Sequence, residues 1–250
     1  MTEQRVALIT GSSSGIGAAI AERLSAEGFR IVVNSARSAE QGTDFARSLP
    51  DAVYVQADIS DEDEARRLVD AAVERYGRLD VLVNSAGTTK VVPHADIAAV
   101  TPELWRTILG VNVIGTWQVS AAAAPYLAKG AANGSGPGNI VNISSVAGSR
   151  PVGSSIPYAV SKAALDHMTR LLAAALGPDI RVNSVAPALT ETPWTQDSPF
   201  FQQIAEKVRQ STPLRRVGTS AEVAEAVLAV LRIEHMTGAV IPVDGGARLI

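Results

Sequence analysis

The stretch Val6-Ala-Leu-Ile-Thr10, followed directly by Gly11-Ser-Ser-Ser-Gly15-Ile-Gly17, decides how this chain is expected to fold. Its first five residues are apolar or β-branched, which is typical of a buried strand. Residues 16–27 then carry the pattern of a helix. Glycines let the chain turn sharply between these two elements and approach a phosphate closely. The free N–H groups and the positive dipole end of the helix would favour a pyrophosphate there.

The glycine spacing is Gly-x-x-x-Gly-x-Gly, which differs from the Gly-x-Gly-x-x-Gly of the standard dinucleotide fingerprint. Such a turn also occurs as a plain strand–helix connection without a ligand. Its place between a strong strand and a helix favours the dinucleotide interpretation.

Further along the chain, short apolar runs alternate with longer amphipathic stretches. Strands are expected at Val6–Thr10, Ile31–Val33, Ala52–Gln56, Val81–Val83, Ile140–Ile143, Ile180–Val185 and Val240–Ile241. Helices are expected at Ile16–Glu27, Ala39–Ser48, Asp61–Tyr76, Pro102–Lys129, Pro157–Leu176 and Ala221–Arg232. Ser60 with Asp63 resembles an N-terminal capping pair. The alternation predicts the α/β class, a doubly wound parallel sheet with helices on both faces, and ligands beyond the carboxyl ends of its strands.

Composition narrows the function classes. The 250 residues suit one large domain, and the net charge of −3 without a basic stripe argues against nucleic acid. The chain has no cysteine, which excludes disulfides and zinc–cysteine sites, and His94, His167 and His235 lack metal-ligand spacing, so no metal is expected. We find no signal-peptide pattern and no uncharged apolar run near the ~18 residues of a membrane span, so a cytoplasmic protein without a membrane partner is expected.

Tyr158 and Lys162 lie four residues apart in the helix expected to begin at Pro157, and therefore on one helix face. A phenol is a poor base near neutral pH, but a nearby ammonium favours the phenolate and lowers the pKa of the tyrosine. Ser145, thirteen residues earlier and just after a strand, is placed to hold a substrate oxygen while charge develops on it. A strand-end serine can also simply cap a turn, a role that we expect of Ser144 rather than Ser145.

These pieces together resemble the short-chain dehydrogenase/reductase family over essentially the whole chain. The matching segments are Thr10-Gly-Ser-Ser-Ser-Gly-Ile-Gly17, Asp58-Ile59, Asn84-Ser-Ala-Gly87, Asn112, Ser144-Ser145, Tyr158-x-x-x-Lys162, Pro187 and Asp244-Gly-Gly246. The resemblance implies a Rossmann-like single domain over residues 1–250, usually with seven parallel strands, that transfers hydride between a bound nicotinamide and a carbonyl or secondary alcohol.

The resemblance also implies roles for the four catalytic candidates. Tyr158 would exchange the proton as general acid or base, Ser145 would bind the substrate oxygen, and Lys162 would bind the nicotinamide ribose. Asn112 would interrupt local helix bonding and help position a water near Lys162.

The expected cofactor is NADP, with NAD as the alternative. No acid stands at Ser35, where NAD-selective dehydrogenases commonly bind the ribose 2′-hydroxyl, and Arg37 is placed to accept a 2′-phosphate. Ser14, where NADP-dependent members often carry a basic residue, points the other way. Ser85 and Ala188 depart from the family's usual asparagine and glycine. The residues expected to contact the cofactor are Gly11, Ser13, Ser14, Gly15, Ile16, Gly17, Ser35, Arg37, Asp58, Ile59, Asn84, Ala86, Gly87, Tyr158, Lys162, Pro187, Thr190 and Thr192.

The substrate is a small carbonyl or alcohol compound whose identity the sequence leaves open. Its expected walls are Thr88–Val100, Val146–Ile156 and Pro187–Ser211, the last as a lid with Trp194, Phe200 and Phe201. Family resemblance offers a 3-oxoacyl thioester as one candidate, beside sugars, secondary alcohols and hydroxysteroid-like compounds. A homotetramer is expected on the same basis, with contacts through the Pro102–Lys129 and Pro157–Leu176 helices. The competing hypotheses are a catalytically silent dinucleotide-binding regulator or scaffold and a sugar-nucleotide epimerase or dehydratase.

Overall fold

The central strands of the chain are apolar on both faces, so each face of their sheet needs a cover. Every residue of β1 (Val6–Thr10), β4 (Val81–Asn84), β5 (Gly138–Ile143) and β6 (Ile180–Pro187) is buried. The computed structural model describes residues 4–132, 136–196 and 199–250, and it joins these strands to β2 (Arg30–Ser35), β3 (Ala52–Gln56) and β9 (Val240–Val243). The resulting sheet has seven strands, all of them parallel, in the order β3-β2-β1-β4-β5-β6-β9.

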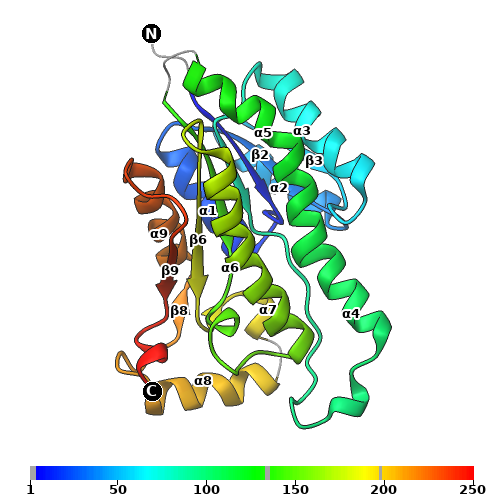
Figure 1. Ribbon diagram of the computed structural model, residues 1–250, viewed down its shortest axis with the longest axis vertical. Helices are drawn as coiled ribbons and strands as arrows, with labels where there is room; N and C mark the ends of the chain where they lie inside the picture. Colours follow the sequence, from blue (N-terminus) through cyan, green and yellow to red (C-terminus); the bar gives the residue numbers. More distant parts are fainter. Residues whose placement is uncertain (1–3, 133–135, 197–198) are drawn as a thin grey trace.

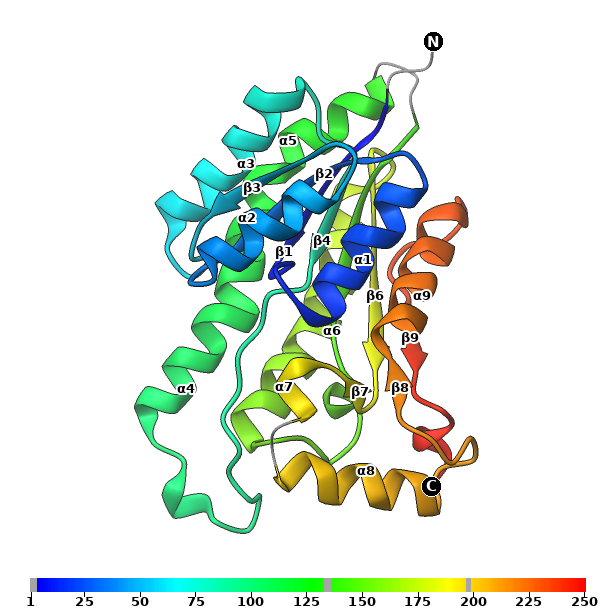
Figure 2. The ribbon, with the colours of Figure 1, turned by 180° about the vertical axis from the view of Figure 1, so that it is seen from behind.

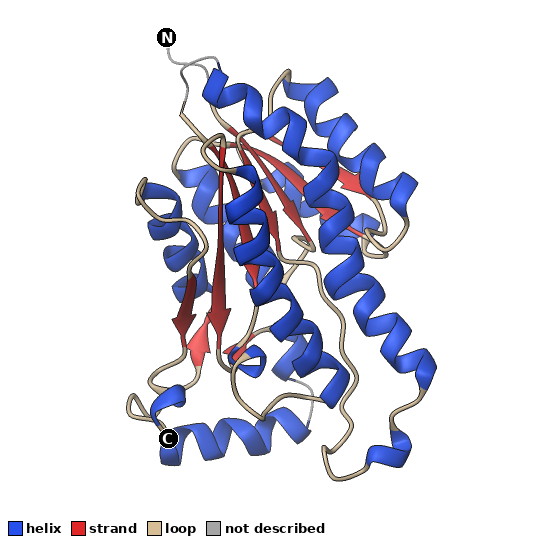
Figure 3. Ribbon diagram, in the orientation of Figure 1, coloured by secondary structure: helices blue, strands red, loops and turns tan. Residues whose placement is uncertain are grey.

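Helices cover both faces of this sheet (Figures 1, 2 and 3). One layer consists of α1 (Gly15–Ala26), α2 (Ala39–Ser48) and α9 (Ser220–Arg232). The opposite layer consists of α3 (Glu62–Tyr76), α5 (Thr116–Ala132) and α6 (Ile156–Leu176). The predicted doubly wound α/β fold is therefore confirmed.

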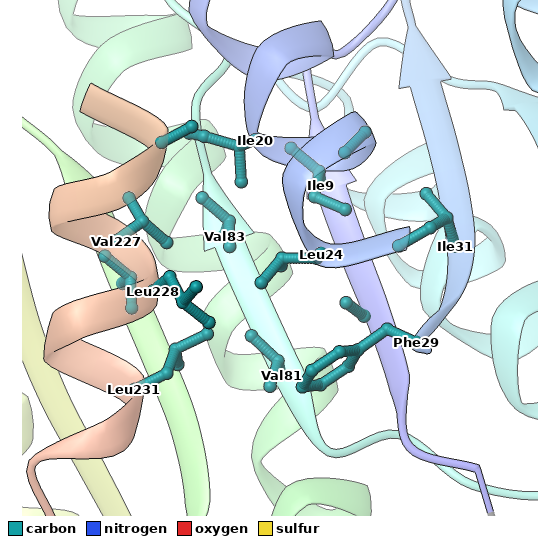
Figure 4. Close-up of a cluster of buried hydrophobic side chains, with 14 of the residues drawn as sticks. Ile9, Ile20, Leu24, Phe29, Ile31, Val81, Val83, Val227, Leu228 and Leu231 are labelled. Atoms are coloured by element: carbon teal, nitrogen blue, oxygen red, sulfur yellow. The ribbon is translucent and has the colours of Figure 1, made fainter. Parts of the chain in front are cut away.

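The first layer packs on the sheet through a cluster of buried apolar side chains. Figure 4 shows Ile20 and Leu24 of α1 facing Val227 and Leu228 of α9 above the strand residue Val83. Burial of side chains of this size contributes about 1.5–3 kcal/mol each to the free energy of unfolding. The contact fixes where α1 begins, and with it the glycine turn that precedes α1.

The carboxyl ends of the strands meet at one edge of the sheet, and the sheet order reverses between β1 and β4. Ligands of doubly wound sheets bind in the crevice at such a point. Beyond this edge lie α7 (Pro193–Gln196), α8 (Pro199–Ser211) and the small pair β7 (Thr190–Glu191) with β8 (Gly218–Thr219) (Figure 1). Short helical turns also occur at η1 (Ile97–Ala99), η3 (Val146–Gly148) and η4 (Ala247–Leu249).

The helix predicted over Pro102–Lys129 is three segments rather than one. It consists of α4 (Pro102–Leu109), the π-helical turn η2 (Gly110–Gly115) and α5. The wider turn contains Asn112, whose side chain bonds to other segments, and apolar periodicity does not reveal a π turn. Within the described residues, the stretch Pro102–Gly130 has the length and hydropathy of a membrane span. Its α5 part contacts α3, β4 and β5, as a core helix does.

One further expectation about local structure is wrong. The N-cap of α3 is Asp61, which accepts a hydrogen bond from Glu64 N at 2.9 Å, whereas Ser60 donates its hydroxyl to Asp58. Pro187–Ser211 interrupts the regular pattern of the sequence, yet it contains α7 and α8. None of the α8 residues is fully buried, but apolar residues recur at helical spacing and are half-buried, which was a usable signal for the helix: Phe200, Phe201, Ile204, Ala205 and Val208.

Candidate active site

The glycine turn between β1 and α1 is so tightly packed that side chains would not fit. A Cβ at Gly11 would lie 2.6 Å from Ala86 Cα, and one at Gly17 would lie 2.3 Å from the Gly11 carbonyl oxygen. Gly11 and Gly15 also have φ values of +62° and +60°, which L side chains rarely adopt. The turn therefore brings bare backbone to the crevice at the β1–β4 reversal.

The first turn of α1 has its N–H groups available for a ligand. Ser14 is the N-cap residue, and its side chain makes no capping hydrogen bond. An α-helix leaves its first four N–H groups without intrahelical partners, and its positive dipole end attracts anions. The turn thus fits the diphosphate of a dinucleotide.

Asn34, near the end of β2, holds the glycine turn through hydrogen bonds. Its Oδ1 accepts a hydrogen bond from Gly11 N at 3.2 Å, and its Nδ2 donates to the carbonyl oxygens of Val55 and Ala57 at 3.1 Å. Ser12 Oγ adds a hydrogen bond from Asn34 N at 3.1 Å. The sequence interpretation missed Asn34 as a site residue, although a lone amide at the end of an apolar strand was a usable signal.

The residues expected at the adenosine ribose lie beside one another at the ends of β2 and β3. Ser35 is buried and its hydroxyl lies 2.9 Å from the hydroxyl of Tyr54, a contact that the sequence did not suggest. Arg37 is exposed. Asp58 bonds to its own loop, because its Oδ1 accepts hydrogen bonds from the N–H and the hydroxyl of Ser60.

The residues at the end of β4 and just after it contact different parts of the protein. Asn84 points into the protein, where its Nδ2 donates to Ser120 Oγ at 3.0 Å and to Asn142 Oδ1 at 2.9 Å. Ala86 lies against the glycine turn through Gly11. Gly87 lies against the catalytic candidates, since a Cβ there would be 3.4 Å from Asn112 Oδ1 and 3.8 Å from Lys162 Nζ.

Asn112 is held at both ends of its amide. Its Nδ2 donates to Thr88 O and to Ser161 Oγ, both at 3.0 Å, and its Oδ1 accepts from Thr88 N at 2.7 Å. Ser161 in turn donates to the Tyr158 carbonyl oxygen at 2.7 Å. The π turn, the β4 loop and α6 therefore meet at one buried amide. Thr88 and Ser161 were not predicted as site residues, because both act through contacts between distant segments.

Tyr158, Ser145 and Lys162 complete the cluster at the N-terminal end of α6. Tyr158 shares a hydrogen bond with the Ser145 hydroxyl, and Lys162 Nζ lies 5.7 Å from the centre of the Tyr158 ring. Lys162 Nζ donates to the Ile143 carbonyl oxygen at 2.8 Å. The structure thus brings all four predicted catalytic candidates together.

The serine that caps the turn after β5 is Ser145, whereas the sequence suggested Ser144 for this role. Ser145 is the N-cap residue of η3 and accepts a hydrogen bond from Ala147 N at 3.2 Å. Ser144 is buried and donates to the Lys162 carbonyl oxygen at 3.3 Å. The cap fixes the direction of the Ser145 side chain and is compatible with its hydrogen bond to Tyr158.

Burial dominates the electrostatics of this cluster. It raises the pKa of Tyr158, against the lowering effect of the hydrogen bond with Ser145. The lowering that the sequence predicted from the Lys162 ammonium is therefore wrong, because burial outweighs it. Burial also lowers the pKa of Lys162 to about 8, against the charge of Asp166. Tyr158 is therefore a protonated phenol at neutral pH, and Lys162 loses its charge within a mildly alkaline range.

The segment after β6 begins against the glycine turn. Thr190 and Thr192 are buried, and a Cβ at Gly15 would lie 3.6 Å from the Thr192 side chain. Phe200 and Phe201 of α8 contact each other edge to face with ring centres 5.2 Å apart. The side chain of Trp194 lies outside the described residues. A cavity of about 260 Å³ lies between β7 and α8, and its lining includes Leu189, Phe201 and Val217 but not Tyr158.

Similarity to known proteins extends over the whole chain. Residues 11–248 match the family model described as enoyl-(acyl carrier protein) reductase. The chain is 64% identical over 248 residues to the protein named ketoacyl reductase 2 of the granaticin polyketide synthase from Streptomyces violaceoruber, covering 99% of this chain and 98% of the relative. It is 38% identical over 251 residues to a 3-oxoacyl-[acyl-carrier-protein] reductase of Thermotoga maritima, covering 98% of each.

Solved structures agree with these matches. A 3-ketoacyl-(acyl-carrier-protein) reductase from Brucella melitensis complexed with NADH superposes with a TM-score of 0.88 at 32% identity, covering 98% of both chains. A short-chain type dehydrogenase/reductase from Mycobacterium ulcerans gives a TM-score of 0.88 at 33% identity, covering 100% of this chain and 92% of that one.

Proposed function

Because the chain belongs to the short-chain dehydrogenase/reductase family and is an NAD(P)-dependent oxidoreductase, we propose that it reduces the ketone of a 3-oxoacyl thioester with NADPH. The observation that carries the proposal is the cluster of Tyr158, Ser145, Lys162 and Asn112 beside the glycine turn. A silent regulator would have no use for this set.

The residues present fit a nicotinamide dinucleotide. The bare backbone at Gly11 and Gly17 and the uncapped first turn of α1 form the diphosphate cradle. When bound, the cofactor supplies the hydride. Lys162 is placed to hold the nicotinamide ribose, and Pro187, Thr190 and Thr192 to line the nicotinamide side of the crevice.

The proton chemistry follows from the state of Tyr158. A phenol whose pKa is raised by burial stays protonated at neutral pH and is a ready donor to a carbonyl oxygen. Ser145 is placed to hold that oxygen by a hydrogen bond as negative charge develops. Lys162 stabilises the phenolate that remains, and Asn112 fixes the backbone of the Thr88 loop and α6 around it. We therefore assign the direction of reduction.

We propose NADPH rather than NADH as the cofactor because of the side chains at and just after the end of β2. Ser35 offers no carboxylate to a ribose 2′-hydroxyl, and the exposed guanidinium of Arg37 suits a 2′-phosphate. A cytoplasmic location, where this cofactor is available in solution, is part of the proposal.

The substrate class is taken from the reductases that the chain resembles, which by name act on ketoacyl groups and, in part, on acyl-carrier-protein thioesters. We assign Pro187–Ser211 as the lid over the acyl chain, with Phe200 and Phe201 on its apolar side. Thr88–Val100 and Val146–Ile156 would form the remaining walls.

A homotetramer remains part of the proposal, built through η2, α5 and α6. Ile114, Trp117, Val160 and Leu171 on these elements are large apolar side chains with exposed fractions between 43% and 58%. Such side chains on neighbouring helices suit a contact with a second copy. Light scattering of the purified chain would test it, and a monomer at micromolar concentration would exclude it.

The decisive experiment is a turnover assay with NADPH and a panel of 3-oxoacyl thioesters. We expect Tyr158→Phe to lower kcat about 10²–10⁴-fold while the variant still binds NADPH, because the proton donor is lost and the glycine turn is retained. Undiminished turnover in that variant would overturn the assignment of Tyr158. Tight NADPH binding without turnover on any carbonyl compound would instead favour the regulator hypothesis.

A further inference from the structure

We propose that Asp166, one helical turn beyond Lys162 on α6, is a positioning residue of this reductase that holds the Ser145 turn against α6 and, through its negative charge, stabilises the Lys162 ammonium. The inference rests on the proposed function, since it assigns how that site is kept in order. Tyr158, Lys162 and Asp166 follow one another at intervals of four residues and share one face of α6.

The Asp166 carboxylate is buried and contacts the segment on both sides of Ser145. Asp166 is 6% exposed, and the Ser144 hydroxyl shares its single proton between the Asp166 carboxylate and the Lys162 carbonyl oxygen. After Ser145, the backbone of Gly148 lies directly on it, because a Cβ at Gly148 would be 2.8 Å from Asp166 Oδ2. The turn that carries Ser145 is thus hydrogen-bonded to α6 at its start, through Ser144, and lies closely against α6 at its end, at Gly148.

A third contact comes from the sheet. Ser184 of β6 lies with its hydroxyl 3.4 Å from Asp166 Oδ1. Together the two serine hydroxyls compensate in part for the loss of water around a buried carboxylate. Burying a carboxylate costs free energy, and Asp166 has no ion pair at contact distance among the described residues. We therefore infer that it has a role beyond packing.

Charge supplies that role. Burial lowers the pKa of Lys162 to about 8, and Asp166 is the acidic group whose charge opposes this effect. Burial raises the pKa of Asp166 itself, opposed by Ser144, Ser184, Arg170 and Lys162. The groups that face Asp166 from β5, η3 and β6 are the serine hydroxyls and the Gly148 backbone, which do not titrate near neutral pH. Its electrostatic partners are therefore Lys162 and Arg170 of its own helix.

Removing the negative charge of Asp166 should therefore change the pH range over which the protein catalyses reduction. Without the negative charge, Lys162 would lose its proton at a lower pH, and the phenolate left by proton transfer would lose its stabilising ammonium. For Asp166→Asn, which keeps the shape, we expect the alkaline decline of kcat/KM to move down by about one pH unit. Asp166→Glu keeps the charge but crowds Gly148, so we expect a lower kcat with the decline unmoved.

The test combines kinetics with a readout that needs no turnover. The pH dependence of kcat/KM is measured for the wild type, both Asp166 variants and the control Asp63→Asn, which removes an exposed acid of α3. The titration of Lys162 is followed in parallel by ¹⁵N NMR of its Nζ. A lower Lys162 pKa in Asp166→Asn, with Asp63→Asn unchanged, is the expected result.

An unmoved Lys162 titration in folded Asp166→Asn would overturn the proposal, even if a substrate is found. If Asp166→Asn does not fold, the wild type still decides. The Lys162 resonance must shift as Asp166 is protonated at acid pH, and no response would equally overturn the inference. Failure of the proposed function shows differently, as absence of carbonyl turnover with the Lys162–Asp166 coupling intact.

Discussion

Gly17→Ala is the substitution whose effect follows most directly from the geometry of the cofactor cradle. Gly17 is a buried residue in the first turn of α1, and an added Cβ would lie 2.3 Å from the Gly11 carbonyl oxygen and 2.8 Å from Ser12 Cα. The first distance is about 1 Å shorter than an ordinary van der Waals contact. Both obstacles are backbone, so α1 and the glycine turn must move apart.

The magnitude follows from two opposing effects. Alanine gains about 1 kcal/mol over glycine in a helix interior, whereas overpacking of this kind costs about 1–3 kcal/mol. We expect a net loss of up to about 2 kcal/mol, which for a domain of this size lowers Tm by up to about 4–8 °C. Displacing the N–H groups of the cradle by about 1 Å should weaken NADPH binding by about 10–100-fold.

The assay is a fluorescence titration of NADPH beside a calorimetric melt, with Gly110→Ala as the matched control. Gly110 has helical backbone angles, and a Cβ there would meet nothing within 4 Å. That variant should bind NADPH as the wild type does and should be no less stable. If Gly17→Ala binds NADPH within a factor of about two of the wild type, the glycine turn is not the cradle that we infer.

Three other predictions address pH and selectivity. For the wild type, kcat/KM for reduction should fall as the pH rises through about 8, where Lys162 loses its charge, and a pH profile that stays flat to pH 10 or so would contradict this. The Arg216 guanidinium and the Thr219 N–H hold the pKa of Glu222 at about 2, below its usual 4.5, so this carboxylate stabilises the fold above the unfolded pKa and the contribution is lost as the pH falls toward 2. Glu222→Gln should therefore cost about 0.5–1 kcal/mol at pH 7, discounted for exposure, and Tm should differ less from the wild type at pH 2–3. Ser35→Asp should reverse the preference for NADPH over NADH by about tenfold or more in kcat/KM, and Arg37→Ala should raise KM for NADPH alone.

Much of the fold could be predicted from local patterns along the chain. The strand–helix alternation and the apolar strands sufficed for the parallel sheet, because burial on both faces leaves a visible run of β-branched residues. The spacing of Ser145, Tyr158 and Lys162 sufficed for the centre of the site. Each of these features depends on residues close together in the sequence.

Contacts between distant segments could not be predicted in this way. The bonds of Asn112 to Thr88 and Ser161 join three elements, and the π turn that makes them possible has the same apolar pattern as an α-helix. The α8 helix was not predicted, although Phe201, Ile204 and Val208 recur at helical spacing and could have indicated it. The contact of Gly148 with Asp166 depends on how a loop lies on a helix, which no periodicity encodes.

The contact between Thr192 and Gly15 has a kinetic consequence. Thr192, in the proposed lid, lies beside the turn that we propose holds the diphosphate, so we expect the position of this segment to depend on whether the turn carries its ligand. A site arranged in this way favours a compulsory order of addition, with the nucleotide entering before the acyl substrate and leaving after the product. Product inhibition by NADP should then be competitive toward NADPH and not toward the thioester, and a random-order pattern would contradict the coupling.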